Sequence, residues 1–269
     1  NVGVAKTALY YSTDPEAPLE SWTLIDEHNG SSYSQNIDTT VMPNGVVYVV
    51  AKIYDAVGNF TYSPKQRYMC DNQGPEQVKN VKCIAVDGTT ATLSWSDVSD
   101  DDISYFVVEC KQSDGVWKSV SRTSTNLGVN LSGLTPEHDY VYRVIGYDKR
   151  SNRGTPSEEI TVTTLKDTIC PKVTKITPDP GYFKSEINLR FTAEDDYRVK
   201  SIEIQTSTDK ESWKTVSEIK ATGESAKCTF DCKLDLKNYE EGSVFVRAKV
   251  YDSYGNVTED KNLTCYEYV

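Results

Sequence analysis

Histidine is scarce in this sequence of 269 residues, with only His28 and His138 present. Zinc sites and nucleophilic triads combine a histidine ligand or base with other reactive groups. Two histidines in separate parts of the chain cannot assemble such a site, so we expect structural or surface roles for both. The sequence shows no other constellation of catalytic groups, and we predict that this chain is not an enzyme.

Long apolar runs are also absent. No stretch of about 18 apolar residues occurs, which is the length that a membrane-spanning helix needs. Residues 1–9 lack the charged and apolar regions of a secretory signal peptide, so any export signal is expected upstream. The sequence therefore predicts no membrane insertion in this part of the protein.

Positive charge is in deficit along the whole chain. The net charge is −11, and the acidic excess is four, four and three in residues 1–72, 73–165 and 166–269. This even spread favours solubility over a charged tail or patch. It argues against nucleic-acid binding, which needs a basic face.

What the sequence does contain is an internal repeat. Three alternating apolar and polar runs each lead through a polar turn to a tryptophan, at Trp22, Trp117 and Trp213. A second pattern is a strand that ends in an aspartate turn, with aspartates at positions 55, 148 and 252. Such alternation predicts strands that run into hairpins. About seven strands in each 90 to 100 residues predict β-sandwiches.

The middle repeat, residues 73–165, resembles a fibronectin type III domain over its full length. Pro75 opens it, and the run 92–95 (Thr-Leu-Ser-Trp) matches the second strand of that family. Residues 134–136 (Leu-Thr-Pro), followed by Tyr140, resemble its tyrosine corner, in which the hydroxyl bonds back to the backbone. Residues 159–163 would be the last strand.

The flanking repeats resemble immunoglobulin-like repeats of large bacterial surface and secreted proteins. Their pattern begins D-x-x-x-P, as at 167–171, continues with a turn like that at 1–4, and ends D-x-x-G-N, as at 55–59 and 252–256. The resemblance implies an all-β chain of three tandem Greek-key β-sandwiches. We call them the first segment (1–72, immunoglobulin-like), the middle segment (73–165, fibronectin type III) and the third segment (166–269, immunoglobulin-like).

The first segment is shorter at its start than the third. Aligning Asp14 with Asp209 places Asn1 opposite Asp196, so the first segment has no counterpart of residues 166–195. We therefore expect it to lack its two N-terminal strands. Either these strands belong to a longer chain, of which this sequence is a part, or another chain supplies them. The linkers at 71–74 and 166–169 are short, which predicts a semi-rigid rod.

Aromatic residues are candidates for ligand binding. The three repeated tryptophans share one position per repeat, which favours packing over sugar stacking. Tyr182 and Phe183 follow the turn 178–181 and are the ligand-binding candidates. Two aromatics on a loop can bind a ligand or pack against the neighbouring domain, and we favour the packing.

Acidic loops raise the question of calcium, which takes six or more oxygen ligands. Residues 97 and 100–102 are aspartates in one loop of the middle segment, which we expect to be solvated. Asp195, Asp196 and Asp252 are expected at one end of the third segment and are the candidate calcium ligands. The simpler hypothesis is that Asp55 and Asp252 accept backbone hydrogen bonds within their turns.

Seven cysteines divide as one, two and four among the segments. Cys83 and Cys110 are expected to point inward from facing sheets, which makes them the disulfide candidate. The rival hypothesis is that the cysteines are buried thiols, and the sequence does not decide between the two.

Two functions fit these patterns. The first is a non-catalytic spacer and interaction module of a larger extracellular or cell-surface protein, whose partners are its neighbouring domains. The alternative is an adhesin module that binds carbohydrate or a host protein through loop aromatics. Neither needs a cofactor other than the candidate calcium.

Overall fold

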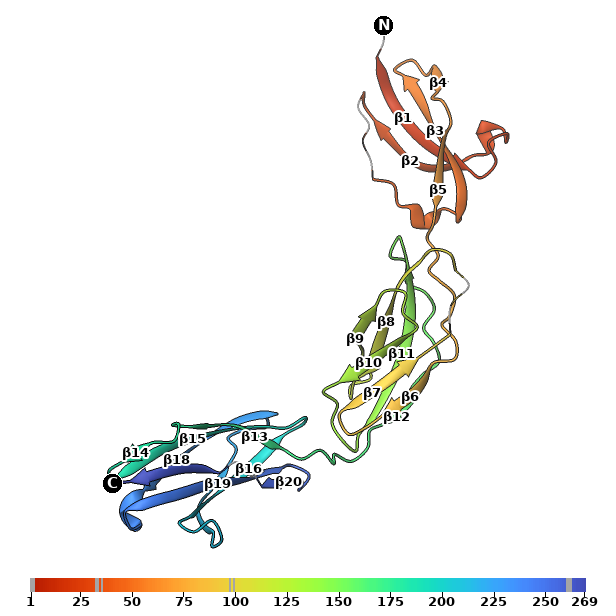
Figure 1. Ribbon diagram of the computed structural model, residues 1–269. Helices are drawn as coiled ribbons and strands as arrows, with labels where there is room; N and C mark the ends of the chain where they lie inside the picture. Colours follow the sequence, from red (N-terminus) through yellow and green to blue (C-terminus); the bar gives the residue numbers. More distant parts are fainter. Residues whose placement is uncertain (1–2, 32–33, 35, 97, 99, 260–262) are drawn as a thin grey trace. The chain divides into compact units, whose positions relative to one another are not determined.

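The structure is a computed structural model that describes residues 3–31, 34, 36–96, 98, 100–259 and 263–269. It is built of β-strands, as predicted, and its described helices are 3-10 turns of three residues each (Figure 1). None of these has the length or apolarity of a membrane-crossing helix. Packing divides the chain into two compact units, one formed by residues 1–79, 97–107 and 144–157, the other by 80–96, 108–143 and 158–269.

The first segment forms one antiparallel sheet. The strand order is β2-β1-β3-β4, and β5 pairs with β3. The strands are β1 (Val4–Ser12), β2 (Thr23–Asn29), β3 (Gly45–Asp55), β4 (Phe60–Tyr62) and β5 (Gln66–Cys70).

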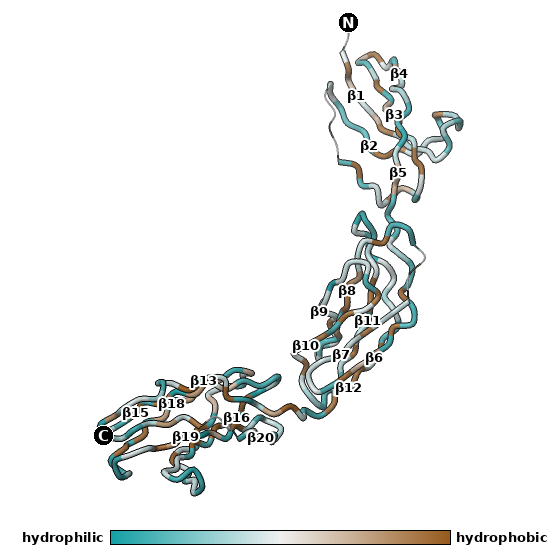
Figure 2. Tube along the Cα trace, in the orientation of Figure 1, coloured by the Kyte–Doolittle hydropathy of each residue, from teal (hydrophilic) through white to brown (hydrophobic). Residues whose placement is uncertain are grey.

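The third segment has two sheets around one core. The larger runs β14-β21-β19-β16-β17, with β20 paired to β19, and the smaller runs β13-β15-β18. The strands are β13 (Lys172–Thr177), β14 (Tyr182–Phe183), β15 (Glu186–Glu194), β16 (Val199–Ser207), β17 (Lys214–Lys220), β18 (Lys227–Asp235), β19 (Gly242–Asp252), β20 (Val257–Glu259) and β21 (Thr264–Tyr268). Apolar and polar residues alternate along β19, so one face of the strand is buried (Figure 2).

The single sheet of the first segment corresponds to the larger sheet of the third segment. Strands β1, β2 and β3 pair with one another as β16, β17 and β19 do. The smaller sheet has no counterpart in the described residues of the first segment. As predicted, the N-terminal strands β13 and β15 of that smaller sheet have no described counterpart in the first segment.

The missing sheet leaves the inner face of β3 half-covered. In β19 the inward residues Val246, Ala248 and Val250 are fully buried. Their counterparts in β3, at positions 49, 51 and 53, are only half-buried. The core of the first segment is correspondingly small and is centred on Met42, Val47 and Cys70.

The middle segment has two sheets, ordered β10-β7-β6 and β12-β11-β8-β9. The strands are β6 (Lys82–Val86), β7 (Thr90–Ser94), β8 (Ile103–Lys111), β9 (Trp117–Thr123), β10 (Gly128–Ser132), β11 (Asp139–Asp148) and β12 (Ile160–Thr163). The predicted tyrosine corner is confirmed, because the backbone amide of Thr135 donates to the Tyr140 hydroxyl at 2.8 Å.

Replacing Phe191 by alanine tests the core of the third segment. Phe191 is fully buried among the apolar residues of both sheets. We expect Phe191→Ala to lower the free energy of unfolding by about 3–5 kcal/mol, because it removes buried apolar surface and leaves a cavity. The control is Val257→Ala on strand β20, whose side chain is exposed, with an expected change within about 0.5 kcal/mol. Equal losses for both variants in urea unfolding would contradict this description of the core.

Candidate metal centre at the aspartate turns

The same type of hydrogen-bonded turn occurs in each of the three segments. Asp252 accepts the backbone amides of Tyr254 and Asn256 at 2.8 Å each, and the Asn256 side-chain amide donates to its second oxygen at 2.6 Å. Asp55 and Asp148 make the same set of bonds with the residues that follow them. The predicted role of Asp55 and Asp252 as acceptors within their turns is therefore confirmed.

Each turn needs one residue in the left-handed region. Gly58 and Gly255 have φ of 92° and 90°, and Ser151 takes the same place in the middle segment with φ of 69°. Glycine adopts this conformation without the steric penalty that a Cβ brings. The glycine of the D-x-x-G-N pattern thus serves the backbone of the turn.

Two of the three turns also hold a linker. The side-chain amide of Asn152 donates to the carbonyl oxygen of Asp71 at 2.9 Å, and that of Asn256 donates to the carbonyl oxygen of Asp167 at 3.1 Å. Asp71 and Asp167 each open a D-x-x-x-P stretch, at 71–75 and 167–171. The same side chain therefore closes the turn and fixes the linker aspartate beside it.

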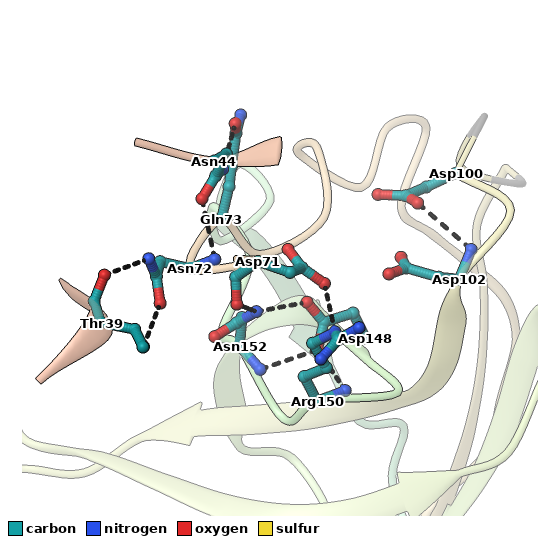
Figure 3. A network of polar contacts seen from close by, with 10 residues as sticks. All are labelled: Thr39, Asn44, Asp71, Asn72, Gln73, Asp100, Asp102, Asp148, Arg150 and Asn152. Carbon is teal, nitrogen blue, oxygen red and sulfur yellow. Dashed lines mark hydrogen bonds and ion pairs between the residues drawn. The ribbon is translucent and has the colours of Figure 1, made fainter. Parts of the chain in front are cut away.

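Asp71, the aspartate of the first linker, belongs to an acidic cluster that also includes an arginine side chain (Figure 3). One carboxylate oxygen each of Asp71, Asp102 and Asp148 lies within 4.8 Å of the others. The guanidinium of Arg150 pairs with Asp71 at 3.1 Å. Hydrogen bonding to Asp100, with burial and the nearby carboxylates, raises the pKa of Asp102 to about 6.

This cluster corrects the prediction of a fully solvated loop at 97 and 100–102. Asp101 is exposed, whereas Asp102 is half-buried and faces the other carboxylates. Asp97 lies outside the described residues.

The second linker aspartate joins a more deeply buried cluster. Asp167, Asp195 and Asp252 each place one carboxylate oxygen within 4.8 Å of the others. Asp167 is 1% exposed and Asp252 is 0% exposed. One oxygen of Asp167 accepts the amide of Ile169, and one of Asp195 accepts those of Tyr197 and Arg198. The remaining oxygen of each is buried without a hydrogen-bond partner.

No described lysine or arginine forms an ion pair with these three carboxylates. The guanidinium of Arg198 pairs with Glu224 at 2.8 Å. Burial raises the pKa of both Asp167 and Asp195, and the charge of Asp196 raises it further. The second cluster thus concentrates negative charge in a buried place. In the first cluster, the positive charge of Arg150 offsets part of the negative charge.

The prediction of a calcium site named two of these three residues. The structure brings Asp195 and Asp252 together, but their third member is Asp167 and not Asp196. The carboxylate of Asp196 instead accepts the hydroxyl of Thr89 at 3.0 Å. The shared D-x-x-x-P pattern of the two linkers was the signal that could have identified Asp167.

Tyr182 and Phe183 do not form one aromatic surface. They lie on strand β14, where Tyr182 is 78% exposed. Phe183 packs edge-on against Tyr266 of the same segment, with ring centroids 5.6 Å apart. The expected packing against a neighbouring domain was therefore wrong for Phe183, which joins its own core.

The candidate disulfide is not formed in the structure. All seven cysteines are free, and the thiols of Cys83 and Cys110 contact the backbone oxygens of Ala85 and Lys111. Each thiol therefore lies against its own strand. Burial raises the pKa of the Cys110 thiol.

Each of the repeated tryptophans is either buried or has an arginine side chain over its ring. Trp22 is buried, and the guanidinium groups of Arg143 and Arg247 lie 4.0 Å from the rings of Trp117 and Trp213. This arrangement fits packing, as expected from their shared position in the repeat.

The pH dependence of Asp102 tests the first cluster. Its folded pKa of about 6 lies above the ordinary 3.8, so the folded state holds this proton more tightly than the unfolded state. The resulting stability is present below the ordinary pKa and is lost as pH rises through about 6. We expect carboxyl-carbon NMR to show this titration, and Asp100→Asn to shift it downward. A wild-type midpoint near 3.8 would contradict the arrangement.

Comparison with known proteins identifies the family of the middle segment. The family model "Fibronectin type III domain" matches residues 76–163. No curated protein sequence matches the chain.

Solved structures of single domains are similar over part of the chain. A fibronectin type III domain of human fibronectin type III domain containing protein 3 shares 25% identity, with a TM-score of 0.33, over 37% of this chain and 94% of that one. The FN5 domain of Drosophila Lar shares 21% identity, with a TM-score of 0.30, over 35% of this chain and 99% of that one. On the family match, residues 76–163 are a fibronectin type III domain within an all-β chain.

Proposed function

We propose that this chain is a spacer and interaction module of a larger extracellular or cell-surface protein. Fibronectin type III domains are generally non-catalytic modules of multidomain proteins, and residues 76–163 match that family. The repeated aspartate turn supports the same role, because two of its copies hold the linker that precedes the next stretch of strands.

The observation that carries the proposal is the bond from each turn asparagine to a linker carbonyl. Asn152 holds Asp71 and Asn256 holds Asp167. A linker held at its first residue has less freedom to swing than one joined through the backbone alone. A module that keeps other domains at a fixed spacing requires this restraint. A catalytic domain would not need it at both linkers.

The histidines and the tryptophans add no competing site. His28 and His138 are both exposed, and His138 packs edge-on against Tyr140. The adhesin alternative has its best support in Tyr182, which is exposed but stands without Phe183 beside it.

Backbone NMR relaxation tests the role of the linker bonds. We expect residues 76–163 and the third segment to show similar rotational correlation times in the wild-type chain. Asn256→Ala should shorten the correlation time of the third segment, because it frees Asp167. Asn59→Ala is the matched control, since it removes the same turn contact where no described linker is held. Unchanged correlation times in Asn256→Ala would contradict the proposed spacer function.

A glycan array tests the alternative. We expect no glycan to be retained through Tyr182. Binding that is lost in Tyr182→Ala and kept in Tyr68→Ala, another exposed tyrosine, would favour the adhesin function instead.

A further inference from the structure

We propose that Asp167, Asp195 and Asp252 bind one calcium ion. Each residue offers one carboxylate oxygen to a common centre, and these oxygens lie within 4.8 Å of one another. The site goes beyond the proposed spacer function, and neither depends on the other.

The three carboxylates bury negative charge that no described side chain compensates. Asp167 and Asp252 are almost wholly buried, and no described cationic side chain pairs with any of the three. An ionised carboxylate that is removed from water needs a cation or a full set of hydrogen bonds. A divalent cation at this point would offset most of the charge that the cluster gathers.

Two of the carboxylates also have an oxygen whose hydrogen bonding is unsatisfied. The Oδ2 atom of Asp167 and the Oδ1 atom of Asp195 are buried without a donor. Buried polar atoms almost always have a partner, and a bound ion is one of the recognised explanations for an exception. In both residues the other oxygen accepts a backbone amide, which fixes the carboxylate and leaves one oxygen for the ion.

The spacing of the three oxygens suits a single calcium ion. Calcium–oxygen distances are about 2.3–2.6 Å, so two oxygens on opposite sides of one ion lie at about 4.6–5.2 Å from each other. Three oxygens within 4.8 Å of one another have a common point at most about 2.8 Å from each, so a shift of a few tenths of an ångström at most brings all three to one ion. Calcium also tolerates irregular sites with six to eight oxygens, whereas magnesium requires a near-ideal octahedron.

The donor set selects a hard cation. All three ligands are carboxylates, and the cluster contains no histidine or cysteine. Zinc and copper favour nitrogen and sulfur ligands, while carboxylate oxygens suit calcium and magnesium. Asp196 lies nearby but bonds to Thr89, so it adds negative charge without being assigned as a ligand.

The first cluster provides the internal comparison. Asp71, Asp102 and Asp148 have the same spacing, but Arg150 pairs with Asp71 at 3.1 Å. The guanidinium of Arg150 places positive charge beside Asp71 there. Asp71→Asn is therefore the matched control for Asp167→Asn, because both change the aspartate that opens a linker.

The test combines calcium titration by calorimetry with thermal unfolding in calcium and in EDTA, on the full chain. We expect wild type to bind one calcium ion. Its unfolding midpoint should rise by roughly 5–10 °C at a hundredfold excess of calcium over the dissociation constant. Asp71→Asn should keep both effects, and Asp167→Asn should lose both.

A second readout separates a binding role from a structural one. In EDTA, Asp167→Asn should unfold at a higher temperature than wild type, because it removes repulsion among the buried carboxylates. Asp195→Asn should behave in the same way and covers the case in which Asp167→Asn does not fold.

Three results would overturn the proposal. The first is no calcium binding by wild type at millimolar concentration. The second is full calcium binding by Asp167→Asn or by Asp195→Asn. The third is equal affinity for magnesium, which would remove the assignment to calcium.

Discussion

The interaction on which the rest depends is the acceptance of backbone amides by one aspartate in each turn. At Asp252 a single carboxylate holds two amides and the side chain of Asn256. This closes the turn after β19 and also directs Asn256 toward the linker carbonyl of Asp167. The turn, the position of the linker and the acidic cluster therefore follow from one carboxylate–amide arrangement.

The two clusters show how the same backbone arrangement leads to different electrostatics. In the middle segment the residue two positions after the turn aspartate is Arg150, whose guanidinium reaches Asp71. In the third segment the corresponding residue is Tyr254, whose hydroxyl donates to the carbonyl oxygen of Pro136. One substitution at this position decides whether the cluster carries its own cation.

Sequence patterns predicted the features that depend on neighbouring residues. The D-x-x-G-N pattern predicted the turn at Asp252, and the spacing of Leu134 to Tyr140 predicted the tyrosine corner, because in both the partners are close in sequence. Features that depend on distant partners were harder to predict. Asp167 was missed because it meets Asp195 and Asp252 only in the folded sheet.

The same distinction explains the other corrections. Phe183 was expected on a loop tip, but pairing of β14 with β21 turns it toward Tyr266. Strand β3 corresponds to β19, yet its inward residues are less buried, because the described part of the first segment has no second sheet over them. Alternation along one strand does not reveal whether a facing sheet is present.

The decisive measurement is a crystal structure of the chain grown with calcium, with anomalous scattering collected to identify the ion. We expect one anomalous peak, about 2.3–2.6 Å from carboxylate oxygens of Asp167, Asp195 and Asp252, and none beside Arg150. A lysine or arginine side chain seated among these three carboxylates, with no peak, would contradict it.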